Sequence, residues 1–80
     1  MKPAVGCSLP RMDSVESAAL CEVGYKEKQR ELYVRFLDSG ETYVYFGVDP
    51  ATYDAFCAAE SKGGYYSQHV RNAFPYERCA

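Results

Sequence analysis

The chain has 80 residues, and its eleven acidic and nine basic side chains give a formal net charge of −2. A chain of this length forms one domain with a small core, and its charge provides no overall attraction for nucleic acid or for an anionic membrane. No apolar stretch approaches the roughly 18 residues of a membrane-spanning helix, so we expect no membrane partner. The few residues before Cys7 are too short for an export signal, which predicts a cytoplasmic protein.

Aromatic rings must fill much of the core, because the chain contains eight tyrosines and four phenylalanines but no tryptophan. The four cysteines form no Cys-x-x-Cys pair, so their spacing matches neither a zinc site nor a thioredoxin-like redox motif. Free thiols are the preferred interpretation of Cys7, Cys21, Cys57 and Cys79.

Residues 1–16 show no sustained periodicity, which predicts a flexible segment that can dock as a short edge strand. Two runs rich in β-branched and aromatic residues follow at 20–26 and 31–37, and the polar residues between them predict a hairpin loop. With that loop, Lys26 faces Glu31 across the ladder as a favourable pair of opposite charge.

Ser39-Gly40 predicts a second turn, because it sets a glycine, which tolerates positive φ, between two alternating apolar runs. A two-residue loop at this point pairs Phe36 with Tyr43 and Val34 with Tyr45. The same register sets two acidic side chains opposite each other, which counts against it.

The alternation of side chains divides this three-stranded sheet into two faces. The face expected to carry the core contains Val23, Tyr25, Leu32, Val34, Phe36, Tyr43 and Tyr45. Because the register turns Tyr43 and Tyr45 inward, we interpret them as structural residues of the core and not as a platform for nucleic-acid bases.

The opposite face is too apolar for a fully solvated surface, since it carries Tyr33, Leu37, Val44 and Phe46. One interpretation is that the N-terminal segment covers this face. The other is that the face binds a ligand, a partner protein or a second copy of the chain. The residues that could provide intramolecular cover are Val5, Leu9, Met12 and Val15.

Asp49-Pro50 predicts the start of a helix, because aspartate caps helix N-termini and proline fits the first helical position. The inward stripe of this helix is predicted to be Tyr53, Phe56, Cys57 and Glu60. Residues 61–64 are expected to end the helix with C-cap glycines.

A second helix is predicted from about Tyr65 to Phe74, and Pro75 ends it. Its inward stripe is Tyr66, Val70, Ala73 and Phe74. Residues 77–80 are expected to form a C-terminal tail. The predicted fold is therefore α+β, a three-stranded antiparallel β-meander followed by two α-helices packed on one face.

Residues of this region form one ordered pattern: Ser17-x-x-Leu20-x-x-Val23-Gly24-Tyr25, Leu32-x-Val34-x-Phe36, Gly40-x-x-Tyr43-x-Tyr45-x-x-Val48, Tyr53, and Ser61-Lys62-Gly63-x-Tyr65-Tyr66-x-x-x-Val70-Arg71. The pattern closely resembles the KTSC domain, a family named for the module at the C-terminus of some lysyl-tRNA synthetases and also found as small stand-alone bacterial proteins. The resemblance implies a KTSC-like domain at residues 17–76. It implies no established reaction, and it suggests RNA as a partner through the synthetase context. The chain departs from the family at Ala18, Lys26 and Ser67, so a site that depends on those side chains would be altered here.

The candidate nucleic-acid site lies near the start of the second helix, where Lys62 and Tyr65 precede Arg71. Backbone N–H groups at a helix N-terminus favour phosphate, and Lys62 would add positive charge. The alternative is an ordinary glycine cap with an Arg71 that is solvated or paired with Asp54 or Glu60.

No catalytic, metal or cofactor site is indicated by the sequence. His69, the one histidine, has no acidic or cysteine neighbour four residues away, and Cys57 lacks the local signature of a nucleophile. We therefore expect a non-enzymatic accessory or binding module with RNA as the candidate partner. The alternative is a protein-interaction module or homodimer that uses the apolar outer face of the sheet.

Overall fold

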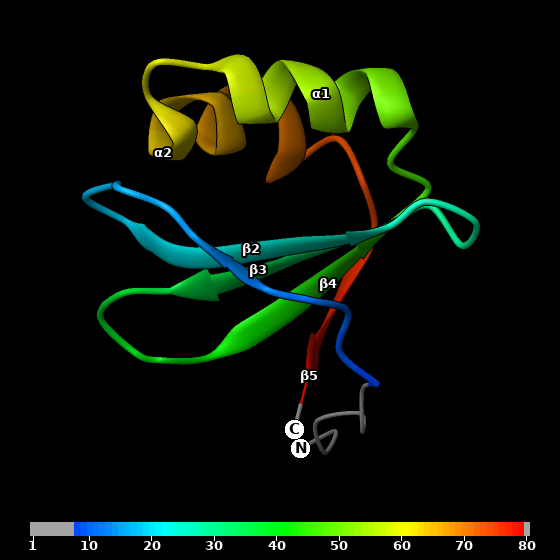
Figure 1. Ribbon diagram of the computed structural model, residues 1–80, viewed down its shortest axis with the longest axis horizontal. Coiled ribbons are helices and arrows are strands. Elements are labelled where there is room, and N and C mark those ends of the chain that lie inside the picture. The colour runs from blue at the N-terminus through cyan, green and yellow to red at the C-terminus, as the bar shows by residue number, and fades with distance from the viewer. Residues whose placement is uncertain (1–7, 80) are drawn as a thin grey trace.

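The computed structural model describes residues 8–79. Five antiparallel strands form one sheet in the order β1-β2-β3-β4-β5, and a helical layer covers one face of it (Figure 1). The strands are β1 (Asp13–Ser14), β2 (Leu20–Lys26), β3 (Glu31–Phe36), β4 (Thr42–Phe46) and β5 (Tyr76–Cys79). The helices are α1 (Pro50–Ala58), α2 (Lys62–Tyr65) and the π-helix η1 (Tyr66–Val70), which continues α2. The predicted α+β class is confirmed, whereas the prediction of three strands is wrong because a short strand is added at each edge.

The β2–β3 hairpin has the predicted loop and register. Lys26 pairs with Glu31, and the loop ends with Arg30 in the left-handed region at a φ of 55°. The Nζ atom of Lys26 lies 5.4 Å from the centroid of the Tyr33 ring, so the strand end also gains a cation–π contact.

The β3–β4 hairpin differs from the predicted register by two residues. Val34 pairs with Tyr43 and not with Tyr45, because the loop contains four residues and not two. The N–H of Gly40 donates to the carbonyl oxygen of Phe36 at 3.0 Å, and Gly40 has a φ of 71°, so the glycine closes the longer loop. A shift of two residues preserves the alternation of side chains, so the predicted faces are correct although the predicted pairs are wrong.

The prediction of a C-terminal tail is wrong, because residues 76–79 form β5 at the edge of the sheet. Tyr76 pairs with Tyr45, and the carbonyl oxygen of Pro75 accepts from the N–H of Phe46 at 2.9 Å. Pro75 therefore leads the chain directly into a strand. A four-residue strand with two adjacent charged residues carries too little alternation to be predicted from periodicity.

The N-terminal segment forms the other edge of the sheet, which agrees with the prediction that it can dock as a short edge strand. We call residues 8–14 the N-terminal strap, since they run along β2 and end in β1, which pairs with it (Figure 1). Gly24 allows this close passage. A Cβ atom at Gly24 would lie 2.7 Å from both the carbonyl oxygen of Arg11 and the Sδ atom of Met12.

The predicted start of α1 is confirmed. The Oδ1 atom of Asp49 accepts from the N–H of Thr52 at 3.2 Å. Two residues of the predicted stripe attach the helix to the sheet. Phe56 is fully buried, and the Tyr53 ring stacks on Tyr25 with a centroid separation of 4.4 Å.

The predicted end of α1 is wrong. The helix stops at Ala58, so Cys57 and Glu60 are exposed and do not belong to an inward stripe. Ser61 begins the next helix instead, since its Oγ atom accepts from the N–H of Gly64 at 3.1 Å. The glycines predicted as a C-cap therefore lie in the first turn of α2.

The second helical segment is shorter than predicted and ends at Val70. Tyr66 and Val70 are buried as expected. Ala73 is exposed, so the predicted inward stripe is wrong for this residue. Phe74 lies in the turn that follows the helix, but it packs against the inner core as predicted.

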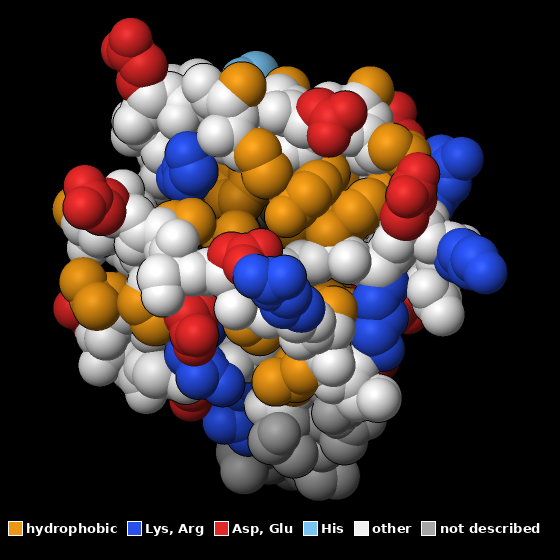
Figure 2. Space-filling model, viewed as in Figure 1, with side chains coloured by type: hydrophobic (Ala, Val, Ile, Leu, Met, Phe, Trp, Pro, Cys, Tyr) orange, Lys and Arg blue, Asp and Glu red, His pale blue; other side chains and the backbone are white. Residues whose placement is uncertain are grey.

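The core lies between the sheet and the helical layer. Figure 2 shows apolar side chains gathered in the seam between these layers, with charged side chains around them. The buried members of this inner cluster are Leu20, Val23, Leu32, Val34, Tyr45, Val48, Phe56, Tyr66 and Val70. Burial of Tyr45 confirms that it is a core residue.

A smaller cluster lies on the outer face of the sheet, where Tyr33, Val44 and Cys79 are buried and Met12 and Phe46 pack against them. Met12 thus provides intramolecular cover from the N-terminal strap. The other covering candidates do not: Val15 packs against the inner cluster, Leu9 is 42% exposed, and Val5 lies outside the described residues.

Candidate binding pocket

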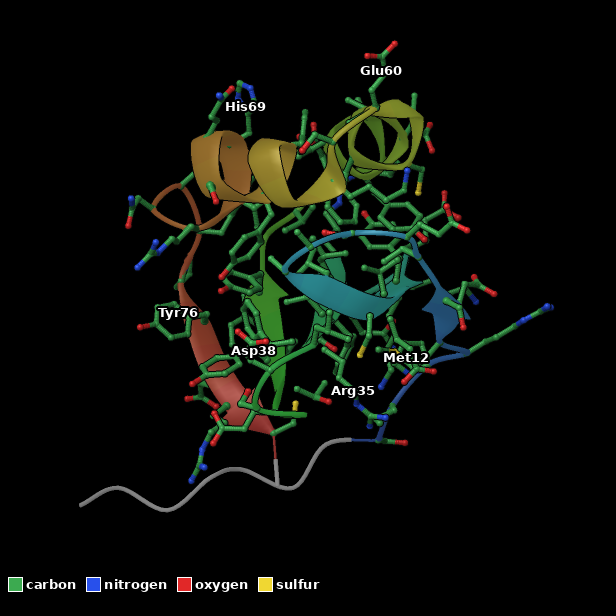
Figure 3. The ribbon with its side chains drawn as sticks, turned by 90° about the vertical axis from the view of Figure 1, so that its left-hand side faces the viewer. Met12, Arg35, Asp38, Glu60, His69 and Tyr76 are labelled. Atoms are coloured by element: carbon green, nitrogen blue, oxygen red, sulfur yellow. The ribbon has the colours of Figure 1, made fainter. Side chains whose placement is uncertain are left out.

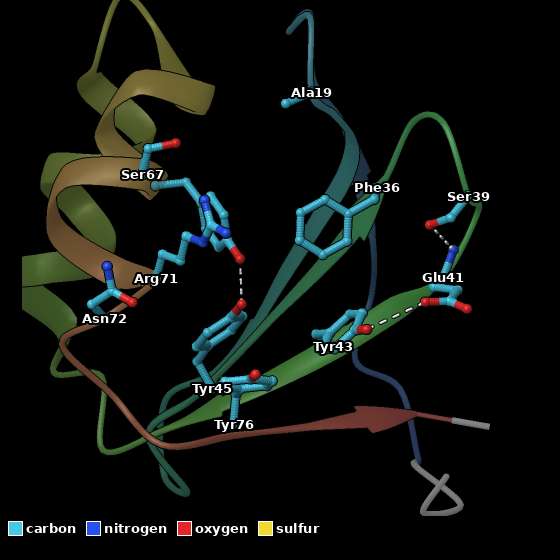
Figure 4. A pocket seen from close by; sticks show the side chains of 11 residues that line it. Ala19, Phe36, Ser39, Glu41, Tyr43, Tyr45, Ser67, Arg71, Asn72 and Tyr76 are labelled. Carbon is cyan, nitrogen blue, oxygen red and sulfur yellow. Dashed lines mark hydrogen bonds between the residues drawn. The ribbon is translucent and has the colours of Figure 1, made fainter.

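An open pocket of about 570 Å³ lies between the inner face of the sheet and η1 (Figure 4). Five of its eleven lining residues are aromatic, and the lining includes no histidine, cysteine or lysine among the residues that the structure describes. The lining residues are Ala19, Phe36, Ser39, Glu41, Tyr43, Tyr45, Tyr66, Ser67, Arg71, Asn72 and Tyr76. Its volume falls within the range of about 300–1,000 Å³ that is typical of small-ligand sites.

The aromatic rings of the pocket hold one another in place. Phe36 meets both Tyr43 and Tyr66 edge to face, with centroid separations of 5.4 and 5.5 Å. The Tyr76 ring, on β5, lies 5.7 Å from Tyr43 and 5.4 Å from Tyr45. These contacts make a continuous and preorganised aromatic wall. Tyr76 is 55% exposed and Tyr43 is half-buried, so part of the wall is open to a ligand.

The buried hydroxyls of the wall satisfy each other. The hydroxyls of Tyr45 and Tyr66 form a hydrogen bond, which is the dashed line from Tyr45 in Figure 4. Burial, with a smaller effect of this hydrogen bond, raises the pKa of Tyr45 far above its ordinary value. Burial, followed by the charge of Glu41, also raises the pKa of Tyr43. The hydroxyls of Tyr43 and Tyr45 therefore stay neutral under physiological conditions.

Two charged side chains face the pocket, and only one of them is neutralised. The carboxylate of Glu41 forms an ion pair with Arg78, with 3.1 Å between Oε1 and Nη1. The exposed guanidinium of Arg71 forms no ion pair with any residue in the described part of the chain, so its predicted pairing with Asp54 or Glu60 does not occur. Arg71 is thus the free charge of the pocket and favours an anionic group.

The π-helix explains how Arg71 reaches the pocket. The backbone N–H of Arg71 donates to the carbonyl oxygen of Tyr66 at 2.9 Å, which is an i to i+5 hydrogen bond. In a regular α-helix with 3.6 residues per turn, residues five apart point to different sides. Tyr66 and Arg71 instead line the same pocket. The 3.6-residue period of an α-helix therefore cannot predict that Tyr66 and Arg71 line the same pocket.

The three residues of the predicted nucleic-acid site are not brought together. Lys62 caps the end of α1, because its Nζ atom donates to the carbonyl oxygens of Cys57 at 3.0 Å and Ala59 at 3.2 Å. Tyr65 packs between helices, with its ring 5.9 Å from that of Phe56. Of the predicted set, only Arg71 lines the pocket.

Sequence reasoning missed Phe36, Tyr66 and Tyr76 as pocket residues, and it assigned Tyr43 to the core alone. A usable signal existed in part, since the Tyr-x-Tyr pair and Phe36 share one predicted face. Tyr76 carried no such signal, because its strand was not predicted.

The predicted interaction surface on the outer face is largely closed within the chain. Tyr33 is 3% exposed and Val44 is 2% exposed, and Phe46 is half-buried. Leu37 is exposed in the β3–β4 loop. The four residues therefore do not form a continuous open apolar surface.

The described residues contain no group of three or more His, Cys, Asp or Glu side chains that could hold a metal ion. His69 and Glu60 project from the helical layer away from the sheet (Figure 3). Cys21 and Cys57 are free thiols, as predicted. Cys79 is disulfide-bonded, so that prediction is wrong for this residue, and Cys7 lies outside the described residues. No helix in the described part of the chain is long and apolar enough to cross a bilayer.

The fold and the pocket define a small α+β domain in which an antiparallel sheet and a helical layer enclose an aromatic site. The family model of the KTSC domain matches residues 16–74, and the chain belongs to this family. A crystal structure of a KTSC domain protein from Yersinia pestis superposes with a TM-score of 0.83 at 27% identity, over 88% of this chain and 97% of that chain.

Two sequence relatives cover the same region. A protein of Tsukamurella paurometabola is 38% identical over 63 residues, which is 79% of this chain and 92% of that protein. A lysine–tRNA ligase of Nostoc punctiforme is 30% identical over 63 residues, which is 79% of this chain and 11% of the ligase. The chain thus spans only a small part of the ligase.

Proposed function

We propose that this protein is a non-catalytic binding module that takes an unpaired nucleotide of an RNA in the aromatic pocket, with the base on the tyrosine wall and a phosphate on Arg71. One observation carries the proposal: a preorganised aromatic wall faces the same open pocket as the Arg71 guanidinium, which forms no ion pair within residues 8–79. Proteins read unpaired RNA by stacking bases on aromatic rings and by pairing arginine with phosphate.

Two further features support this proposal. The pocket is too small for a duplex but admits a single nucleotide, because its volume is about 570 Å³. The lysine–tRNA ligase relative contains a matching region, and its name connects it with an RNA substrate. The net charge of −2 agrees with local contacts and not with a broad electrostatic attraction.

Titration of labelled single-stranded and structured RNA at two salt concentrations tests the proposal. We expect Arg71→Ala to weaken binding and to reduce the salt slope by about 0.7, the value for one phosphate contact on a single strand. We expect Tyr76→Ala to weaken binding about tenfold, within the range for loss of one stacked base, whereas Tyr76→Phe keeps the ring and the affinity.

The matched control is Lys28→Ala, which removes an exposed positive charge from the β2–β3 loop outside the pocket. This variant should bind as the wild type does. If no RNA shows saturable, salt-sensitive binding, the proposal fails. It also fails if Lys28→Ala and Arg71→Ala weaken binding equally, because the pocket then plays no special part.

A further inference from the structure

Glu41 is fixed in orientation at the side of the pocket opposite Arg71 (Figure 4). Its Oε1 atom accepts from Nη1 of Arg78 at 3.1 Å, and its Oε2 atom accepts from the hydroxyl of Tyr43 at 3.3 Å. Its backbone N–H donates to the Oγ atom of Ser39 at 3.2 Å, which holds the loop that carries it. A carboxylate held at both oxygens and at its backbone cannot turn freely.

This carboxylate still has unused acceptor capacity. Its two oxygens offer about four lone-pair sites, and the contacts with Arg78 and Tyr43 use one on each oxygen. The Glu41 side chain is 41% exposed, so a ligand in the pocket can reach it. Each oxygen can therefore accept one more donor, and the best match is a ligand with two donors side by side.

The nucleobases differ in this property. The Watson–Crick edge of guanine presents a ring N–H beside an amino group, which are two adjacent donors. Adenine and cytosine each present an amino group beside a ring nitrogen that only accepts. Uracil presents one N–H between two carbonyl oxygens, and a carboxylate repels both of those oxygens. A fixed carboxylate thus favours guanine over the other three bases, because each of those bases would set an acceptor atom against an oxygen of the carboxylate.

We propose that Glu41 reads the base and that the pocket selects guanine, with Arg71 on the opposite side taking the phosphate. This inference rests on the proposed function and adds its specificity. Arg71 and Glu41 lie on opposite sides of the aromatic wall, so a nucleotide between them presents its phosphate to one and its base edge to the other (Figure 4).

The test is a titration of short oligouridylates in which one central position is uridine, adenosine, cytidine or guanosine. The wild type should bind the guanosine oligomer at least tenfold more tightly than the uridine oligomer. Glu41→Gln should remove most of this preference, because the amide replaces one acceptor oxygen with a donor. Its affinity for the uridine oligomer should not fall, since Arg71 and the aromatic wall remain.

Arg78→Gln is the matched control for the structural role of Glu41. It breaks the ion pair but leaves the carboxylate and its hydrogen bond from Tyr43, so the preference for guanosine should fall less than in Glu41→Gln. Glu41→Asp provides a second variant, which keeps the charge but retracts it by one methylene and should also lose the preference.

The possible failures are distinct. If the wild type binds all four oligomers equally, or if Glu41→Gln keeps the preference for guanosine, the role of Glu41 is overturned and the proposed function stands. If Arg78→Gln loses the preference as fully as Glu41→Gln does, the ion pair and not the carboxylate governs the site, which also overturns the inference. If no oligomer binds, the proposed function fails together with this inference.

Discussion

Tyr33 is the residue whose ionisation is most directly linked to the stability of the outer face. It is 3% exposed, and its hydroxyl donates to Oε1 of Glu31 at 2.8 Å. Burial, followed by this hydrogen bond to a carboxylate, raises the pKa of Tyr33 from 10.0 to about 12. The folded state therefore binds the phenolic proton of Tyr33 more tightly than the unfolded chain does.

The sign of the resulting pH dependence follows from linkage. Because the folded-state pKa lies above the unfolded one, the stability that Tyr33 contributes is complete below pH 10 and is lost as the pH rises from 10.0 towards about 12. We expect the urea midpoint of the wild type to fall over this interval. Tyr33→Phe should lose about 1 kcal/mol below pH 10, for the missing hydrogen bond, and should show a shallower fall above it.

Other tyrosines have raised pKa values as well, so Tyr33→Phe reduces the alkaline slope without abolishing it. The pKa values of Tyr25, Tyr43, Tyr45 and Tyr53 are raised, in each case with burial as the largest cause. An alkaline slope in Tyr33→Phe equal to that of the wild type would contradict the assignment to Tyr33.

At the scale of elements, the N-terminal strap and β2 fit together only because position 24 has no side chain. The backbone oxygen of Arg11 and the Sδ atom of Met12 would both lie 2.7 Å from a Cβ atom there. In a strand without such a neighbour, replacement of glycine by alanine stabilises by about 0.5–1 kcal/mol. Here we expect Gly24→Ala to destabilise by about 1–3 kcal/mol, the usual effect of overpacking.

The sign of that change is diagnostic, and urea unfolding measures it. The double variant Gly24→Ala with Met12→Ala removes the flexible contact but keeps the backbone contact from Arg11. It should therefore remain less stable than Met12→Ala alone. A stabilised Gly24→Ala would show that the strap does not pass this close to β2 at Gly24.

The elements that the sequence predicts well are those with a strong local signal. Asp49-Pro50 marks the start of α1, and the alternation in β2 and β3 sets their faces and their shared register. The errors lie where tertiary contacts decide. Gly40 suits both a two-residue and a four-residue loop, and the contacts of the folded chain select the longer one. Ser61 suits either the end of one helix or the start of the next.

At the scale of the whole molecule, the pocket needs three elements distant in sequence, and this limits its prediction. Tyr43 comes from β4, Tyr76 from β5, and Arg71 from the turn after η1. The sequence places Tyr43 on the correct face and marks Arg71 as a candidate. It cannot bring Tyr76 to Tyr43, because that contact depends on the short edge strand, nor show that a π-turn aligns Arg71 with Tyr66.

The arrangement of layers also bears on self-association, since each face of the sheet is covered within one chain. The helical layer covers the inner face, and Met12 with Phe46 covers Tyr33 and Val44 on the outer face. A sheet covered on both faces leaves little apolar area for a stable dimer. We therefore expect light scattering to give the mass of a single chain for the wild type.

Removal of part of the outer cover should change that result. Met12→Ala should destabilise the fold by about 1–2 kcal/mol, which is less than the 2–5 kcal/mol typical of a fully buried methionine because Met12 is half-buried. It should also make the scattering mass rise with protein concentration, since Tyr33 and Val44 become accessible. Leu9→Ala, which removes an exposed side chain of the same strap, should change neither quantity. A wild-type dimer at low concentration, weakened by Phe46→Ser, would instead support association through the outer face, because only an interface at that face would make the mass depend on Phe46.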